Sequence, residues 1–108
     1  MDKLNDIGSE RAVLAGLMQH GIDGYISVSD LISHETFVNT NNQIIYKCIK
    51  HCIDDDIKID VSTIVSAAQQ LNYLESINTD QELKYIKSLL DFPIQKENII
   101  NFAAQIKK

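Results

Sequence analysis

Residues 40–53 read Thr-Asn-Asn-Gln-Ile-Ile-Tyr-Lys-Cys-Ile-Lys-His-Cys-Ile and indicate the fold most clearly. Thr40 and Gln43 form a capping-box pattern, in which each side chain satisfies a backbone N–H group at the start of a helix. The apolar residues that follow recur every three or four positions, which predicts one buried helical face. That face consists of Ile45, Cys48, Ile49, Cys52 and Ile53. The stretch therefore predicts an amphipathic helix that ends at the acidic run 54–56.

Two stripes with the same spacing precede this helix. The first ends before Gly21, a residue that favours a helix stop. The second is followed by a short turn at 33–36 that is expected to bring Phe37 to the core. The two stripes comprise Val13, Leu14, Leu17 and Met18, and then Tyr25, Val28, Leu31 and Ile32.

Three more apolar stripes follow the helix predicted at residues 40–53. Asp60 is the expected N-cap of a fourth helix, and a loop is expected around residues 74–78. A second capping-box pattern at 79–82 opens a fifth helix, and Pro93 separates it from a sixth. The stripes are Val61, Ile64, Val65, Ala68 and Leu71, then Leu83, Ile86, Leu89 and Leu90, then Ile99, Phe102, Ala103 and Ile106.

The whole chain therefore predicts an all-α protein, a compact orthogonal bundle of about six helices. No sustained alternation of period two indicates a strand. Its 108 residues fit one domain. We expect this domain to span residues 9–108, after a flexible amino-terminal segment at 1–8.

The bulk composition excludes several classes of function. The net charge is -5, and the ten Lys and Arg residues are scattered, so the chain is expected to be a poor direct DNA binder. No apolar run approaches the ~20 residues that a bilayer crossing needs, and the amino terminus has no signal-peptide core. We therefore expect a cytoplasmic protein that works through protein contacts.

No active site can be assembled from the motifs. The four glycines fit neither a Walker A loop nor a dinucleotide fingerprint, and no serine has a nucleophile-elbow context. Glu10, Glu35 and Glu82 could act as acids or bases, but each lies near an expected helix start, where a carboxylate needs no catalytic explanation. We predict no catalytic residue, no cofactor, no ATP hydrolysis and no tight DNA binding.

Cys48, His51 and Cys52 are the one candidate metal cluster, because spacings of three and four converge on one helical face. A zinc site would need a fourth ligand, and His20 and His34 are the only other histidines. We predict instead that both cysteines are reduced core thiols beside the isoleucine stripe. The acidic run 54–56 with Asp60 lacks the spacing and glycine of a calcium loop, so we predict a solvated turn and no metal.

Five ordered stretches resemble the amino-terminal domain of DnaB-family replicative DNA helicases. The resembling stretches are 9–16 (Ser-Glu-Arg-Ala-Val-Leu-Ala-Gly), 31–37 (Leu-Ile-Ser-His-Glu-Thr-Phe), 42–46 (Asn-Gln-Ile-Ile-Tyr), 59–64 (Ile-Asp-Val-Ser-Thr-Ile), and Asn98 and Ile99 with Phe102, Ala103 and Ile106. Two departures concern partner specificity. Asn42 and Gln43 replace a His-Arg pair, and residues 77–80 replace a Gly-Gly turn.

This resemblance implies a collar domain without ATPase motif. Such a domain would assemble with other helicase protomers, as a dimer or within a hexameric ring, and would dock primase or a helicase loader. The domain would contact DNA only indirectly, through the motor domain of a parent ATP-dependent helicase. This chain would then be a fragment of that helicase. The alternative is a free-standing regulator that mimics the collar.

Self-association of the isolated chain is a further expectation, as a weak dimer, since closed twofold contacts are common among identical subunits. Four tyrosines are candidates for the contact area, although each could instead cap the core with its hydroxyl in water. They are Tyr25, Tyr46, Tyr73 and Tyr85.

Overall fold

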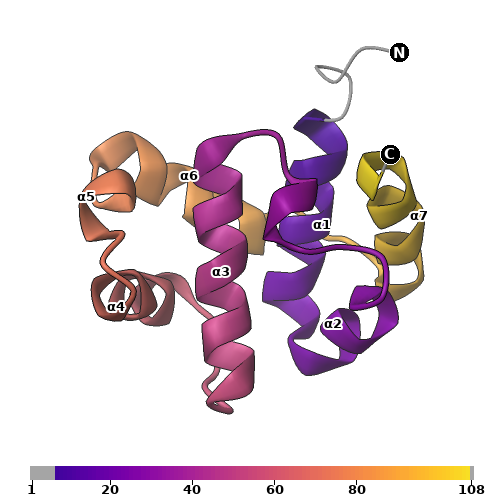
Figure 1. The fold of residues 1–108 in the computed structure, drawn as a ribbon, viewed down its shortest axis with the longest axis horizontal. Helices are drawn as coiled ribbons and strands as arrows, with labels where there is room; N and C mark the ends of the chain where they lie inside the picture. Colours follow the sequence, from indigo (N-terminus) through magenta and orange to yellow (C-terminus); the bar gives the residue numbers. More distant parts are fainter. Residues whose placement is uncertain (1–6, 108) are drawn as a thin grey trace.

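The computed structural model describes residues 7–107, which form seven α-helices and one short 3-10 helix (Figure 1). The α-helices are α1 (Ile7–His20), α2 (Ile22–Val28), α3 (Thr40–Asp54), α4 (Val61–Gln70), α5 (Leu74–Ile77), α6 (Asp80–Asp91) and α7 (Lys96–Lys107), and η2 (His34–Thr36) is the 3-10 helix. The prediction of an all-helical bundle is confirmed. α1 begins at Ile7, inside the predicted segment 1–8, whose first six residues lie outside the described part.

α1 is the central helix of the bundle and packs against α2, α3, α6 and α7. Its residues from Ala12 to Met18 are all buried, on every side of the helix. The predicted stripe is therefore only part of its buried surface, because a helix surrounded by others has no polar face to keep in water. Gly16 allows α7 to approach, since a Cβ there would lie 2.5 Å from Cγ1 of Ile99.

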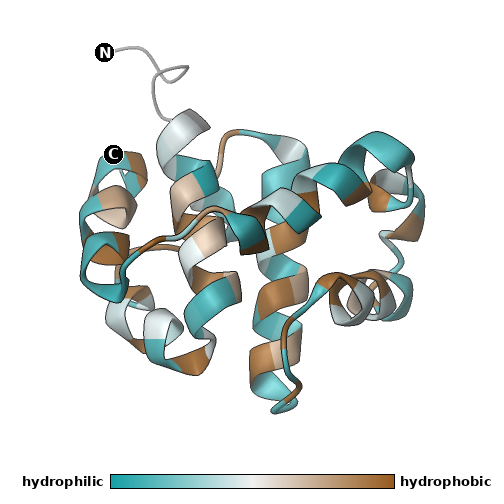
Figure 2. Ribbon diagram, turned by 180° about the vertical axis from the view of Figure 1, so that it is seen from behind, coloured by the Kyte–Doolittle hydropathy of each residue, from teal (hydrophilic) through white to brown (hydrophobic). Residues whose placement is uncertain are grey.

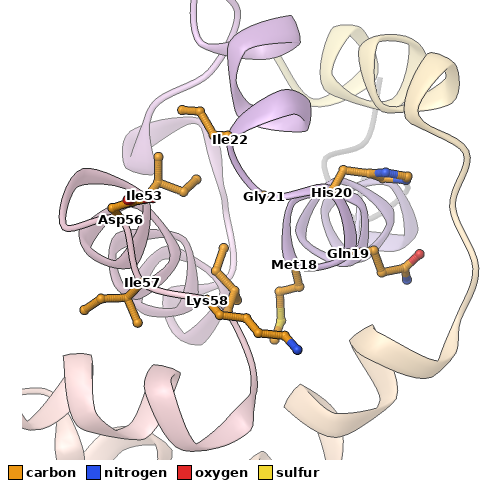
Figure 3. A pocket seen from close by; sticks show the side chains of 10 residues that line it. Met18, Gln19, His20, Gly21, Ile22, Ile53, Asp56, Ile57 and Lys58 are labelled. Atoms are coloured by element: carbon orange, nitrogen blue, oxygen red, sulfur yellow. The ribbon is translucent and has the colours of Figure 1, made fainter.

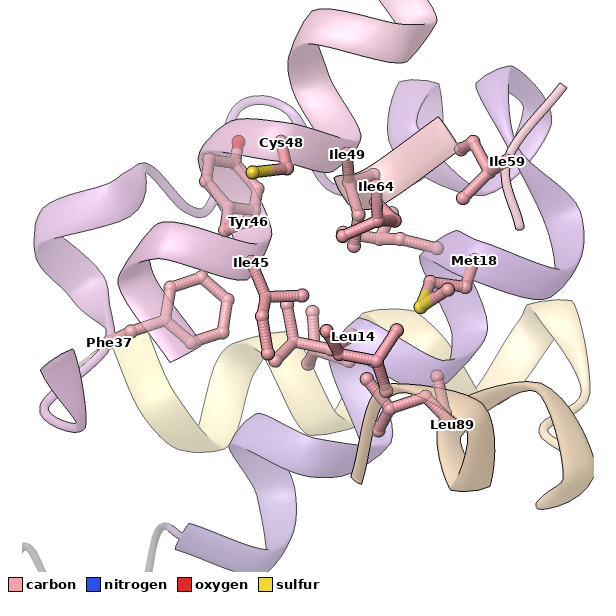
Figure 4. Close-up of a cluster of buried hydrophobic side chains, with 14 of the residues drawn as sticks. Leu14, Met18, Phe37, Ile45, Tyr46, Cys48, Ile49, Ile59, Ile64 and Leu89 are labelled. Atoms are coloured by element: carbon pink, nitrogen blue, oxygen red, sulfur yellow. The ribbon is translucent and has the colours of Figure 1, made fainter. Parts of the chain in front are cut away.

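The core is filled by side chains from all seven α-helices of the described residues and from the connections between them (Figure 4). Phe37, delivered by η2 as predicted, is 1% exposed, and its ring lies 5.2 Å from the ring of Tyr46. The radius of gyration of 12.6 Å is close to the ~13 Å expected for a compact domain of this length.

The start of α3 corrects one prediction. Asn39, and not Thr40, is the N-cap, because its side chain accepts a hydrogen bond from the backbone N–H of Asn42 at 2.9 Å. The Gln43 side chain donates to the carbonyl of Phe37 instead of completing a capping box with Thr40. By contrast, the predicted N-cap Asp60 is confirmed, and it forms a reciprocal capping box with Thr63 at the start of α4.

Two helices end in the same hydrogen-bonded arrangement, the Schellman motif. After α3, Asp56 adopts a positive φ of 58°, and the N–H of Ile57 donates to the carbonyl of Cys52 at 2.8 Å. After α4, Asn72 takes a φ of 68°. Asp and Asn tolerate this left-handed conformation better than other residues with a side chain, so these residues end the helices without glycine.

The segment 74–78 corrects a second prediction, since the structure places α5 where the sequence predicts a loop. One turn of helix there buries Ile77 completely. The helix of the second predicted stripe is also shorter than predicted. α2 ends at Val28, and Leu31 and Ile32 lie in the turn that follows it.

α3 divides the bundle into two sides (Figure 1). α4 and α5 lie on one side, whereas α1, α2 and α7 lie on the other, and α6 passes behind α3. α4 is seen almost end-on beside the upright α3, so these two packed helices cross steeply. None of the helices in residues 7–107 combines the length and apolar character needed to cross a membrane.

Candidate interaction surfaces

The two thiols of α3 are buried, which confirms the core-thiol prediction. Cys48 is 0% and Cys52 1% exposed, and both are unbridged. Burial, with the neighbouring Cys52 as a smaller cause, raises the pKa of the Cys48 thiol to about 12. Burial also raises the pKa of Cys52, whose Sγ lies 3.7 Å from the carbonyl oxygen of Thr63. Both sulfurs are therefore protonated at neutral pH and pack as small apolar groups.

His51 has its polar contacts with Gln70 and Asp55 and not with the two thiols. Its Nε2 lies 2.7 Å from Oε1 of Gln70 and 3.4 Å from a carboxylate oxygen of Asp55. Within residues 7–107, no three His, Cys, Asp or Glu side chains gather in an arrangement that could hold a metal ion. The acidic run 54–56 is exposed, as predicted, and Asp54 pairs with Lys50 at 3.0 Å.

His20 and Gln19, at the end of α1, hold the connection between α6 and α7. The Gln19 amide donates to the carbonyls of Leu89 and Phe92 and accepts from the backbone N–H of Ile94. Nε2 of His20 lies 2.7 Å from the Ile94 carbonyl oxygen. These two polar residues close the α6–α7 connection onto the central helix, a role that the sequence analysis missed.

Glu10 is the only charged residue among those described that is fully buried, at 0% exposure. It lies in the first turn of α1, as expected, but its carboxylate binds the segment that starts α3. It accepts hydrogen bonds from the N–H groups of Val38 at 2.7 Å and Asn39 at 3.4 Å, and from Nδ2 of Asn42 at 2.9 Å. Oδ1 of Asn42 in turn accepts from the Tyr85 hydroxyl at 2.8 Å. The network joins α1, α3 and α6.

The other carboxylates and the tyrosines make local contacts. Glu35 is exposed in η2, and Glu82 lies in the first turn of α6, as predicted. All four tyrosines contact their own chain. Tyr46 stacks near Phe37 in the core, Tyr73 accepts a hydrogen bond from Lys47, and Tyr25 packs half-buried against the core. Tyr46 is buried, whereas Tyr25, Tyr73 and Tyr85 are half-buried and keep some exposed surface.

A groove of about 470 Å³ opens between the α1–α2 turn and the α3–α4 connection (Figure 3). Met18 and Ile59 form its buried floor, while Ile22 and Ile57 stand on opposite rims, 51% and 41% exposed. Ile57 is held there by the Schellman motif that ends α3. Lys58 reaches across the mouth (Figure 3). The groove is lined mainly by aliphatic groups, so it suits an apolar side chain better than a polar substrate.

A second hollow, of about 350 Å³, lies between the start of α4 and the side of α6. Val61 and Leu83 are its half-buried apolar residues, and Asp80, Lys84 and Lys87 are its charged residues. Neither lysine forms an ion pair with another residue in the described range 7–107. Because Asp80 lines the hollow beside the two lysines, it carries charges of both signs around an apolar surface.

The amino-acid sequence of this helical bundle matches a known protein family. The family model described as "DnaB-like helicase N terminal domain" matches residues 2–108. This chain belongs to that family. No curated protein and no solved structure matches it.

In this DnaB-like helicase N-terminal domain, two members of the carboxylate network, Glu10 and Asn42, lie in the stretches that carry the resemblance. Glu10 and Gly16 lie in the first stretch, and the structure gives each a packing role. Asn42, which departs from the family's His-Arg pair, supplies the amide that connects Glu10 to Tyr85.

Proposed function

We propose that this domain is a non-catalytic assembly module of a replicative helicase, which joins helicase protomers in a ring and docks primase or a helicase loader. The observation that supports it most is the apolar groove between the α1–α2 turn and the α3–α4 connection. Exposed aliphatic groups around a concave surface mark sites of protein contact. Membership of the DnaB-like family supplies the context of a replicative helicase.

The chemistry of the chain agrees with this role. The 108 residues contain no Walker A sequence, and the groove holds no converging set of acid, base and nucleophile. Glu10, the one fully buried carboxylate among residues 7–107, has all its hydrogen bonds within the fold. A partner would therefore be recognised by shape and apolar contact, as when a helix lies in a groove.

The proposal is tested by titrating the chain against the primase, the helicase loader and the helicase of the same organism. Ile57→Ser should weaken binding of the primase or loader about ten-fold, since an exposed anchor in a groove contributes strongly to affinity. Ile100→Ser, at a similarly exposed isoleucine (43%) on α7, is the matched control and should bind like the unmodified chain. Equal affinities of the two variants would reject the groove, and absence of binding to all three proteins would reject the function.

A further inference from the structure

A polar pocket of about 220 Å³ lies between the first turns of α3 and α6. The residues that line it are Asn39, Asn41, Asn42, Gln81, Glu82 and Tyr85. Seen from behind, α6 lies in front of α3, and the first turns of both helices carry the hydrophilic colour (Figure 2). This pocket is at the start of α3, whereas the apolar groove is at its end, so the two sites are separate.

The Glu82 carboxylate is the charged group of this pocket, and the fold does not use it fully. The backbone N–H of Glu82 donates to the Thr79 cap at 3.2 Å, but its side chain does not return to complete a capping box. Oε1 of Glu82 is shielded from water and accepts no hydrogen bond within residues 7–107. A buried acceptor without a donor costs free energy, and the terminal torsion of a glutamate turns easily. A donor that enters the pocket would therefore find an unused carboxylate oxygen.

The charges around the pocket are negative on balance. The Glu10 carboxylate lies beneath it and accepts a hydrogen bond from Nδ2 of Asn42 at 2.9 Å. Burial raises the pKa of the Tyr85 hydroxyl in the pocket wall, and the charges of Glu10 and Glu82 raise it further. Arg11, whose Cζ lies 5.8 Å from the centroid of the Tyr85 ring, acts in the opposite direction. The partial positive charge of each helix start is met by its own capping side chain. Two carboxylates and one guanidinium thus favour a cationic ligand.

We infer that this pocket receives the guanidinium group of an arginine from a partner protein. A guanidinium holds five N–H donors in one plane, so it can bond the Glu82 carboxylate together with the carboxamide oxygens of Asn41 and Gln81. Arginine pairs with carboxylates through parallel hydrogen bonds and is enriched in protein interfaces. Val38, immediately before the α3 cap, is 48% exposed, and its burial would stabilise such a contact. The inference goes beyond the groove and does not depend on it.

The test uses N-acetyl-arginine amide, which imitates an arginine within a polypeptide, and the uncharged N-acetyl-citrulline amide as its matched control. Each is titrated into the isotope-labelled full chain and followed by nitrogen–proton correlation NMR. The arginine probe should shift the side-chain amide signals of Asn41 and Gln81. The shifts should saturate with a dissociation constant on the order of 1 mM, the affinity expected of a ligand of this size. The citrulline probe should leave these signals unchanged.

Two matched variants locate the charge that the probe recognises. Glu82→Gln keeps the size of the side chain but removes its charge, and it should weaken binding of the arginine probe about ten-fold or more. Glu75→Gln, at an exposed carboxylate on α5, changes the net charge equally and should bind like the unmodified chain. Circular dichroism checks that both variants are folded, and the comparison of arginine with citrulline on the unmodified chain needs neither variant.

Four results would overturn the inference. The first is that the arginine probe gives no saturable shift at the pocket, or that the Glu82→Gln and Glu75→Gln variants bind it equally. The second is that N-acetyl-lysine amide binds as tightly, since the pocket would then recognise charge alone. The third is that calcium chloride shifts the same signals at lower concentration, which would make the pocket a metal site. The fourth is that free arginine binds more tightly than its amide, which would indicate a small molecule instead of a partner protein. None of these results decides docking in the groove, which Ile57→Ser tests separately.

Discussion

Replacing Glu10 by alanine should destabilise the fold more than any surface substitution. The change removes a fully buried carboxylate that accepts three hydrogen bonds, from Val38, Asn39 and Asn42. A buried donor left without its acceptor costs about 1–3 kcal/mol. The Val38 N–H and the Asn42 amide have the two shorter bonds, so we expect a loss of about 3–5 kcal/mol. This loss is a large share of the roughly 5–15 kcal/mol that stabilises a domain of this size. At about 4 °C per kcal/mol, the melting temperature should fall by roughly 12–20 °C.

Urea unfolding followed by far-ultraviolet circular dichroism measures this loss. Glu10→Gln keeps one acceptor oxygen and should lie between the alanine variant and the unmodified chain. Glu35→Ala removes an exposed carboxylate from η2, and it is the control that should stay within about 0.5 kcal/mol of the unmodified chain. A folded Glu10→Ala variant that matches this control would refute the structural role of the network.

Three further predictions concern packing, thiol reactivity and helix capping. Gly16→Ala should destabilise the fold by about 1–3 kcal/mol because its Cβ would overlap Ile99, whereas Gly8→Ala, in open space at the start of α1, should be neutral or stabilising; equal urea midpoints would contradict this. With its pKa raised to about 12, Cys48 should not react with Ellman's reagent at pH 8 until the chain unfolds, and rapid native labelling would refute its burial. Asp60→Ala should lower the free energy of unfolding by about 1 kcal/mol at neutral pH. Hydrogen bonds from Ser62 and Thr63 lower the pKa of the Asp60 carboxyl in the folded chain. The stability that this carboxylate contributes is therefore present above its unfolded pKa of about 3.9 and is lost as the pH falls through its lower pKa in the folded state. The urea midpoints of the variant and the unmodified chain should then converge in acid, and a difference that persists below that value would argue against the cap.

Local signals predicted most of the helices because each depends on residues close in sequence. Asp60 and Thr79 cap their helices as expected, although the Glu82 side chain does not complete the capping box predicted at 79–82. Pro93 separates α6 from α7. Asn39 was missed because Asn and Thr both cap helices well. Which of the two residues becomes the N-cap depends on where the backbone changes from extended to helical, and here it changes after Asn39. α5 was missed because a single turn carries no periodic pattern, and its formation depends on the pocket that buries Ile77.

The surfaces and the buried polar network could not be predicted in the same way. Glu10 and Asn42 are 32 positions apart, and only the packing of α1 on α3 brings them together. The four tyrosines suggested an interface, yet Tyr46 is buried and the other three are half-buried against their own chain. Ile26 belongs to a helix whose other face is buried, so sequence alone does not say which isoleucines remain exposed.

The most direct test of the account is sedimentation equilibrium of the unmodified chain across a wide range of protein concentration. Ring assembly requires copies of this domain to contact one another, so the apparent mass should rise above the monomer mass of 12.2 kDa as the concentration increases. A mass that remains at 12.2 kDa up to the highest concentration would contradict the claim that this domain assembles through its own surface.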